Sequence, residues 1–156
     1  GVETGNRIQL SGQGEVGPGG GTSGDLYVEI VEIPHEYLLR DENNLHISIA
    51  IPMSSAAIGT TVSIDTFDGP QKVEIKEGTQ SGSTFTLKGL GVTRLRGGGR
   101  GDLIVHIEVV IPGKLTREQT ELMKKFAQLR NEDGSKVIVH TNSDQGFFGK
   151  LRNAFR

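Results

Sequence analysis

The hydrophobic positions of this chain fall mostly into short stretches in which apolar and polar residues alternate. The clearest example is residues 46–51, where Ile47, Ile49 and Ile51 alternate with polar or small residues. Successive side chains of a strand point to opposite faces, so this pattern predicts a strand with one buried and one wet face. Other β-branched stretches are bounded by Gly, Pro, Asn or Asp and predict further strands. The strands are expected at residues 7–10, 25–33, 45–51, 61–67, 72–75, 84–88 and 102–111.

Local signals connect these strands. Asp68-Gly69 lies between two of them and predicts a hairpin turn, and residues 54–58 are expected to form one short helical turn. Pro34 and Pro112 each follow a predicted strand, remove a backbone donor and disfavour helix before them. Both prolines are therefore expected at the ends of folding units.

A different pattern begins after Pro112. Residues 116–119 form a capping-box signature, and the apolar positions that follow have the spacing of one helical face. This stripe consists of Leu122, Met123, Phe126 and Leu129. Such a stripe packs either on the preceding β-unit or on a second copy of the chain, and the sequence leaves both open.

The strand pattern occurs twice. Residues 1–33 align without a gap on residues 78–110, at an offset of 77, and twelve of the 33 aligned pairs are identical. One folding unit has therefore been used twice. Residues 35–77 precede the second copy and have no counterpart before Gly1, so we expect the chain to be a fragment cut within its first unit.

Composition narrows the chemistry. The formal net charge is −2, which provides no global field for nucleic acid or an anionic membrane. The chain has no cysteine, hence no thiolate zinc site, and no apolar run approaches the length of a membrane span. A cytoplasmic protein without membrane or nucleic-acid partners is expected.

Three candidate motifs give weak support for a nucleotide, nucleic-acid or metal site. Residues 12–17 match G-x-G-x-x-G, but Pro18 and three glycines follow where a dinucleotide site needs a helix. Arg94, Arg96 and Arg100 lie in a glycine-rich loop, and a nucleic-acid contact there remains a rival interpretation. The four histidines lack the spacing of a metal site, and no catalytic constellation is present. No catalytic residue and no metal ligand is therefore assigned, which argues against an enzyme.

The tail, residues 131–156, contains a possible short strand at residues 136–140 and a basic amphipathic segment near its end. The apolar residues of that segment are Phe147, Phe148, Leu151, Ala154 and Phe155. A basic amphipathic segment can lie on a membrane surface. Because it is short, docking onto the protein itself or onto a dimer partner is preferred.

Several motifs occur in an order that resembles a known family. They are residues 1–5 (GVETG) leading to 10–14 (LSGQG), 24–28 (GDLYV), Pro34-His35 followed by 39–41 (LRD), 97–103 (GGGRGDL) and Leu115-Thr116. Over residues 1–130 the chain resembles the C-terminal region of DnaJ, the J-domain heat-shock co-chaperone family. The resemblance points to a bacterial member of the zinc-containing class.

The resemblance implies a fold and a domain organisation. Tandem two-sheet β-sandwich units are expected, followed by a helical dimerisation segment. Residues 1–34 correspond to the end of the first, client-binding unit, 35–113 to the second unit, 114–130 to the dimerisation helix and 131–156 to the tail. Zinc is expected only in a cysteine-rich module of the parent protein, outside this chain, and the segment itself needs no cofactor.

The resemblance also implies a function. Family members bind unfolded polypeptide, form homodimers and deliver clients to a DnaK-type ATPase chaperone through the J-domain, whose His-Pro-Asp motif is absent here. The client-binding candidates are Ile8, Leu10, Val28 and Ile30, and the dimerisation candidates are Leu122, Met123, Phe126 and Leu129. Two alternatives stay open. Either the four client-binding candidates simply fill a core, or the chain serves dimerisation alone.

Overall fold

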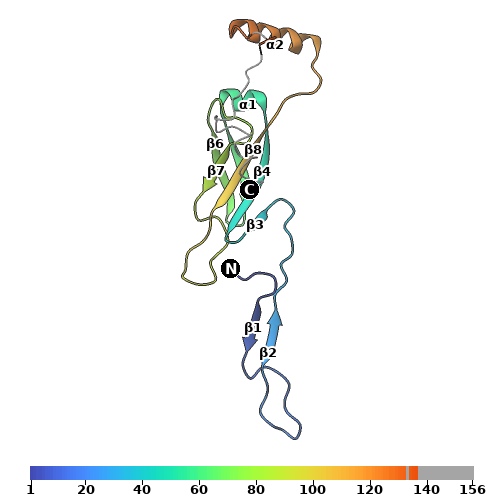
Figure 1. Cartoon of the computed structure of the whole chain (residues 1–156), viewed down its shortest axis with the longest axis vertical. Coiled ribbons are helices and arrows are strands. Elements are labelled where there is room, and N and C mark those ends of the chain that lie inside the picture. The colour runs from blue at the N-terminus through green and yellow to red at the C-terminus, as the bar shows by residue number, and fades with distance from the viewer. Residues whose placement is uncertain (133, 137–156) are drawn as a thin grey trace. The chain divides into compact units, whose positions relative to one another are not determined.

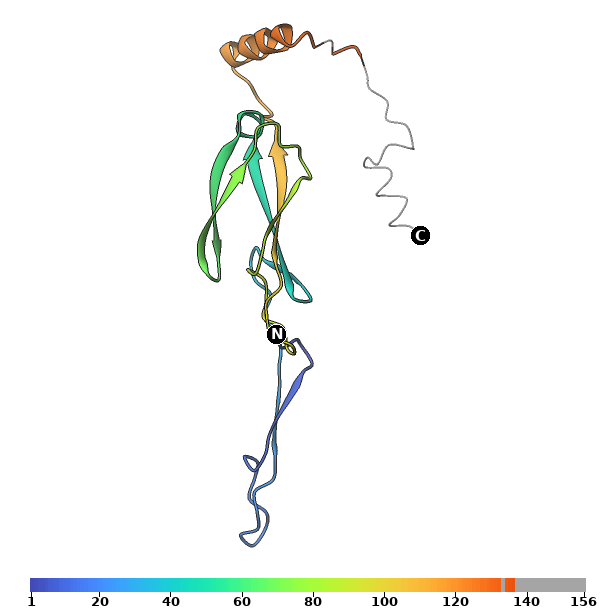
Figure 2. The same cartoon turned by 90° about the vertical axis from the view of Figure 1, so that its left-hand side faces the viewer.

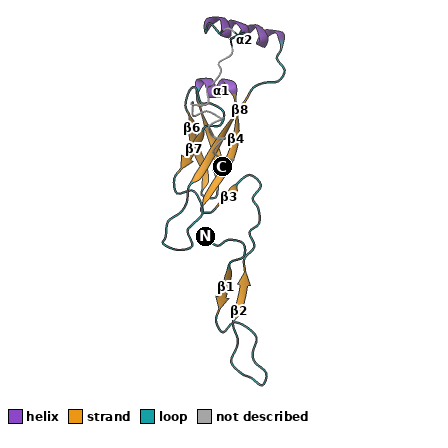
Figure 3. Cartoon of the chain, viewed as in Figure 1, coloured by secondary structure: helices purple, strands orange, loops and turns teal. Residues whose placement is uncertain are grey.

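The computed structural model describes residues 1–132 and 134–136 and is mostly β-structure, with two helices in this part of the chain (Figures 1 and 3). The chain separates into two compact units, Gly1–Pro112 and Gly113–Arg156. The divisions predicted at residues 34 and 130 stay predictions. The elements are β1 (Arg7–Leu10), β2 (Leu26–Glu29), β3 (Leu39–Asp41), β4 (Asn44–Pro52), α1 (Met53–Ile58), β5 (Thr60–Thr66), β6 (Gly69–Ile75), β7 (Thr84–Leu87), β8 (Leu103–Val110) and α2 (Arg117–Leu129).

The first compact unit contains a β-sandwich. One layer is a four-stranded sheet in the order β3-β4-β8-β7, in which β4 and β8 run parallel and the other neighbours run antiparallel. The antiparallel hairpin β5-β6 forms the second layer, which lies beside the β4 and β8 layer in Figure 2. The helix α1 links β4 to β5 at one end of the sandwich (Figure 1).

An aliphatic core lies between these layers. Ile47 and Ile51 on β4 are buried, as the alternating pattern predicts, while His46, Ser48 and Ala50 lie on the other face. Leu103, Val105 and Ile107 on β8 are also buried, and Ile64, Val73 and Ile75 contribute from the hairpin. Burial of this apolar surface provides the main favourable free energy of folding for the sandwich.

The β5-β6 hairpin turns one residue earlier than predicted. Phe67 and Asp68 form a two-residue loop, and Gly69 already pairs with Thr66 as the first residue of β6. Gly69 has a φ of 90°, which an L side chain rarely adopts. Strand β6 thus includes Pro70, whereas the predicted strand begins at residue 72. A proline is tolerated there because β6 pairs only with β5 in the described residues.

The repeat is visible in two equivalent hydrogen bonds between a backbone N–H and an Asp side chain. In the first copy, Asp25 Oδ1 accepts from the Gly12 N–H at 3.0 Å, and in the second, Asp102 Oδ1 accepts from the Gly89 N–H at 2.8 Å. Each Asp thus closes the same turn at the same offset. The residues of the G-x-G-x-x-G match form this turn and the connection after it, and no helix follows them.

Two strand predictions need correction. Strand β2 ends at Glu29, short of residue 33, because β1 begins at Arg7 and gives residues 31–33 no partner strand. Strand β3, Leu39–Asp41, was not predicted, because three residues carry too little periodicity to be read. It forms by pairing with β4 across a tight turn. In this pairing Leu39 lies opposite His46.

The second compact unit contains α2, and its start agrees with the predicted capping box. Thr116 Oγ1 accepts from the Gln119 N–H at 3.2 Å, and the Thr116 N–H donates to Gln119 Oε1 at 2.8 Å. Most of the tail, including the helical segment expected near its end and most of the strand expected at residues 136–140, lies outside the described residues. No helix in the described part of the chain is long and apolar enough to cross a membrane.

Candidate functional site

The β1-β2 hairpin carries an exposed aliphatic face. Its register pairs Ile8 with Val28 and Leu10 with Leu26, so all four side chains point to the same side. They remain 36 to 44% exposed. The structure therefore brings together three of the four predicted client-binding residues and adds Leu26, which occupies an alternate position and could have been found by the same pattern.

The fourth predicted residue, Ile30, lies just beyond β2. It is partly buried, and its backbone is held by the first copy's N-terminal turn. The Ile30 N–H donates to Asn6 O at 2.9 Å, and Ile30 O accepts from the Gly5 N–H at 3.0 Å. Ile30 therefore borders the aliphatic face, and its backbone groups are already paired.

In the second copy of the repeat, the face equivalent to this aliphatic face is buried. By the repeat, Val28 corresponds to Val105 and Ile30 to Ile107, which are 0 and 2% exposed. Ile8 and Leu10 correspond to Phe85 and Leu87, which pack against the same core. The aliphatic face of the first copy is thus equivalent to a core face. In the second copy the β5-β6 hairpin covers this face, and in the first copy the described residues leave it partly exposed.

The two copies also differ at the strand edge. Strand β8 pairs with β7 on one side and in parallel with β4 on the other. Its counterpart β2 pairs only with β1 in the described residues. Within the described residues the outer edge of β2 is therefore unpaired, at the position that β4 occupies beside β8.

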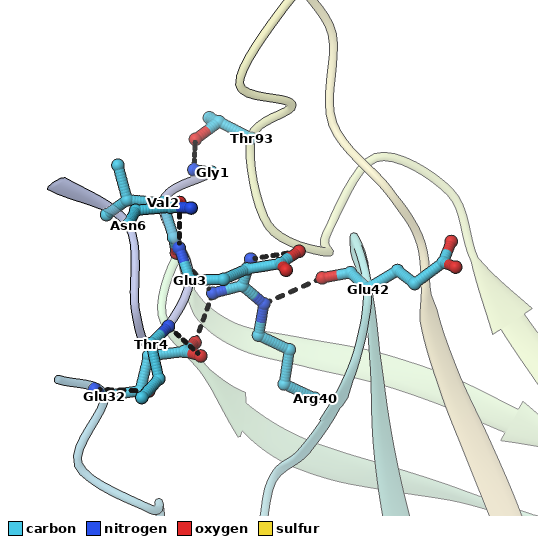
Figure 4. A network of polar contacts seen from close by, with 9 residues as sticks. All are labelled: Gly1, Val2, Glu3, Thr4, Asn6, Glu32, Arg40, Glu42 and Thr93. Atoms are coloured by element: carbon cyan, nitrogen blue, oxygen red, sulfur yellow. Dashed lines mark hydrogen bonds and ion pairs between the residues drawn. The ribbon is translucent and has the colours of Figure 1, made fainter. Parts of the chain in front are cut away.

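Arg40 connects the first copy to the sandwich (Figure 4). Its guanidinium donates to Val2 O at 2.7 Å and to Glu32, and its Nε donates to Glu42 O at 2.7 Å. The side chain of Arg40 is only 20% exposed. Hydrogen bonds lower the pKa of Glu32. The bond from the Thr4 N–H has the largest effect, and the bond from Arg40 has a smaller one. This network was not predicted, because its members are far apart in sequence.

A cleft of about 440 Å³ lies beside this network. Its apolar wall includes Leu39, Leu45 and Phe67, and its polar wall includes Glu32 and Arg40. Sequence reasoning missed it, since the wall comes from four separated segments. Its volume lies within the range of ligand pockets in proteins.

The predicted dimerisation residues lie on α2. Leu122, Met123, Phe126 and Leu129 are 62, 38, 48 and 75% exposed, and no residue of this helix is buried in the described part of the chain. The four positions share one face of the helix by their spacing. An exposed apolar stripe of this kind is an expected contact surface.

The structure also places Arg100 of the glycine-rich loop and two of the four histidines. Arg100 is engaged within the unit, because its guanidinium binds both carboxylate oxygens of Asp68. Among the histidines, the structure brings His46 and His106 within hydrogen-bond distance although they are 60 residues apart in sequence. The sequence spacing gave no sign of this pair.

The repeated β-unit, the exposed aliphatic face and the apolar helix define a β-sandwich scaffold with exposed apolar surface. A family model described as the DnaJ C terminal domain matches residues 1–112. The chain is 53% identical over 155 residues to Chaperone protein DnaJ 2 of Streptomyces coelicolor and 50% identical over 157 residues to Chaperone protein DnaJ 1 of Nocardia farcinica. Identity to Chaperone protein DnaJ 2 of Mycobacterium tuberculosis is 43% over 156 residues.

Each of these matches covers 99% of this chain and 41% of the relative. The chain belongs to the DnaJ chaperone family and corresponds to its C-terminal domain. The zinc that the family resemblance implies for a cysteine-rich module has no thiolate ligands here, since the chain has no cysteine.

Proposed function

We propose that this chain is the part of a DnaJ-type co-chaperone that binds unfolded polypeptide and holds two copies together. The observation that carries the proposal is the exposed aliphatic face of β1-β2 in a chain whose residues 1–112 match the DnaJ C terminal domain. In the parent protein, bound clients would be delivered to a DnaK-type ATPase chaperone through a J-domain. The chain acts by binding, in the cytoplasm, without a catalytic group or cofactor of its own.

Client binding follows from the chemistry of this face. An unfolded polypeptide exposes apolar side chains together with unpaired backbone groups. Its backbone pairs with the free edge of β2, and its side chains cover Ile8, Leu10 and Val28. Each fully buried aliphatic side chain contributes about 1.5–3 kcal/mol, and because this term is non-directional the face accepts many sequences.

Dimerisation rests on the stripe of α2. Leu122, Met123, Phe126 and Leu129 present apolar surface that a second copy would bury. Two copies would offer two client sites on one scaffold, and the second contact with a client would then form at high effective concentration.

A second candidate is a structural dimerisation segment that binds no client itself. The burial of Val105 and Ile107 favours it, since they are the counterparts of Val28 and Ile30. In that case the aliphatic face is a core face and not a binding groove.

Suppression of aggregation of a chemically denatured model protein separates the two candidates. The wild-type chain is expected to suppress aggregation, and Val28→Asp is expected to abolish the effect. Tyr27→Asp is the matched control, because Tyr27 is the neighbouring residue on the opposite face of β2 and is 61% exposed. Equal activity of the two variants would leave only the dimerisation candidate.

A further inference from the structure

His46 and His106 form a hydrogen-bonded pair across the central strands of the sandwich. Strands β4 and β8 are parallel, and their register places His46 opposite Ile104 and His106 opposite Ser48. The two histidines are therefore diagonal neighbours on the face of the sheet that points away from the core. His46 Nδ1 lies 2.9 Å from His106 Nε2, and the ring planes differ by 21°. A hydrogen bond of this length needs one N–H and one lone pair in the gap between the rings.

Asp41 determines which nitrogen of His46 carries the proton. Its Oδ2 lies 3.9 Å from Nε2 of His46, the ring nitrogen that is not engaged with His106. A carboxylate accepts hydrogen bonds and does not donate, so it favours the proton of neutral His46 on Nε2. His46 Nδ1 then accepts from the Nε2–H of His106. In the neutral pair the contact is thus satisfied, and Nδ1 of His106 stays unprotonated.

We propose that this pair is a proton-sensitive switch within the sandwich. A first added proton can be held at Nδ1 of His106, because the gap still contains one N–H and one lone pair. A second added proton leaves both rings with N–H groups only. Two N–H groups then face each other across 2.9 Å without an acceptor, and two like charges lie in contact. The contact therefore opens, and His46, whose side chain is 26% exposed, is the ring that turns into solvent.

The neighbouring groups cannot preserve the contact in its doubly protonated form. On this face of the four-stranded sheet the neighbours are Leu39 and Asp41 on β3, Ser48 on β4, Thr84 and Thr86 on β7, and Ile104 and Glu108 on β8. No lysine or arginine occupies this face within the four strands. Asp41 lies at the outer nitrogen of His46, and Glu108 lies two residues beyond His106 along β8. Both carboxylates attract protons to the pair, but the two nitrogens in the gap face only each other.

The switch makes folding depend on pH in one direction. In the unfolded chain the two histidines are separate, and each takes up a proton as the pH falls below about 6.5. The folded pair keeps its contact only while it binds one proton fewer than the unfolded chain does. Stability therefore falls on acidification, because a difference of one bound proton raises the unfolding equilibrium constant by about tenfold for each pH unit over which it persists.

A double-mutant cycle measured by urea unfolding isolates the pair from other titrating groups. It compares the full chain, His46→Gln, His106→Gln and the doubly substituted chain at about pH 7.5 and at about pH 5, on either side of the ordinary histidine range. At the higher pH the coupling should be favourable by about fivefold in the unfolding equilibrium constant, as expected for one hydrogen bond. At the lower pH it should vanish or reverse.

A cycle of His35→Gln with His106→Gln is the matched control. It should show no coupling at either pH, because the ring of His35 contacts Tyr37 and Phe67 instead. Coupling between His46 and His106 that is absent at the higher pH, or equally favourable at the lower pH, would overturn the switch.

Nitrogen-detected NMR of the wild-type histidines gives a readout that needs no variant. At the higher pH, His46 Nδ1 should have the chemical shift of an unprotonated nitrogen and a scalar coupling to the proton on His106 Nε2. Both signatures should be lost at the lower pH. Two histidines that take up protons independently of each other, without this scalar coupling, would also overturn the switch.

Discussion

Arg100 and Asp68 form a bidentate ion pair in which each terminal guanidinium nitrogen lies 2.8 Å from a different carboxylate oxygen. Arg100 ends the glycine-rich loop before β8, and Asp68 lies in the turn of the β5-β6 hairpin. Arg100 Nε also donates to Gly91 O at 2.9 Å. The pair thus fastens the loop to the second layer of the sandwich, which gives this arginine a structural role within the unit.

This ion pair should make stability depend on pH. The hydrogen bonds from Arg100, and then its charge, hold the pKa of Asp68 below its usual range. A carboxyl with a lowered folded-state pKa stabilises the fold fully above its unfolded pKa, about 4, and loses this contribution as the pH falls through the folded value. The free energy of unfolding of wild type should therefore exceed that of Asp68→Asn at neutral pH, and the difference should shrink below about pH 4.

Urea unfolding of both proteins over a series of pH values measures this difference. Asp65→Asn, a carboxylate-to-amide change on the same hairpin, serves as the control. A difference between wild type and Asp68→Asn that stays constant into the acid range would contradict the assignment.

Gly101→Ala should destabilise the sandwich by more than about 1 kcal/mol, because a Cβ at this position would lie 1.8 Å from the backbone oxygen of Asn43. Gly24 is its counterpart in the repeat and the matched control. A Cβ there meets only Glu15 O, at 3.8 Å, so Gly24→Ala should change the free energy of unfolding by less than about 0.5 kcal/mol. Chemical denaturation measures both values, and equal effects would refute the prediction.

Arg40→Gln should loosen residues 1–33 and leave the sandwich core intact. The substitution removes the guanidinium that binds Val2 O and Glu32. Amide hydrogen exchange should become faster at Gly5 and Ile30 and remain unchanged at Val105. Arg7→Gln is the control, since the Arg7 to Glu29 pair is exposed on both sides, with 3.6 Å between the charged atoms. Unchanged exchange at Gly5 in Arg40→Gln would show that the network does not hold the first copy.

Phe126→Glu and Met123→Glu should convert the dimer proposed above into a monomer, because each places a charge in the apolar stripe of α2. Sedimentation velocity at micromolar concentration measures the change. Lys125→Glu alters charge on the same helix outside the stripe and should remain dimeric. A monomeric wild type at this concentration would remove the dimer from the proposal.

Thr116→Ala should weaken the start of α2 by about 1 kcal/mol, since it removes the side-chain acceptor for the Gln119 N–H. Hydrogen exchange at Gln119 should quicken by about fivefold, which corresponds to that free energy. Thr116→Ser retains the hydroxyl and should remain close to wild type. Equal exchange in the two variants would mean that the cap contributes little.

Much of the fold could be predicted from local patterns. The capping box placed the start of α2, and the alternation in residues 46–51 identified the buried face of β4. These signals are local, because they depend on which side of a helix or strand a residue occupies. Strand β3 could not be found in this way, since three residues become a strand only by pairing with β4.

The candidate site was only partly predictable. Ile8, Leu10 and Val28 follow from strand alternation, and the register of β1 with β2 adds Leu26. Neither the cleft beside Phe67 nor the Arg40 network has a sequence signal, because their residues come from segments joined only by folding.

The sequence by itself determined the repeat, most of the strands, the capped helix and, through its motifs, the family. Each of these depends on neighbouring residues or on self-similarity along the chain. Tertiary structure alone decided that β4 and β8 run side by side in parallel, and with that pairing it placed His46 against His106. It also decided that Val105 is buried while Val28 is exposed. The two valines have the same local sequence pattern, and only the presence of a covering layer distinguishes them.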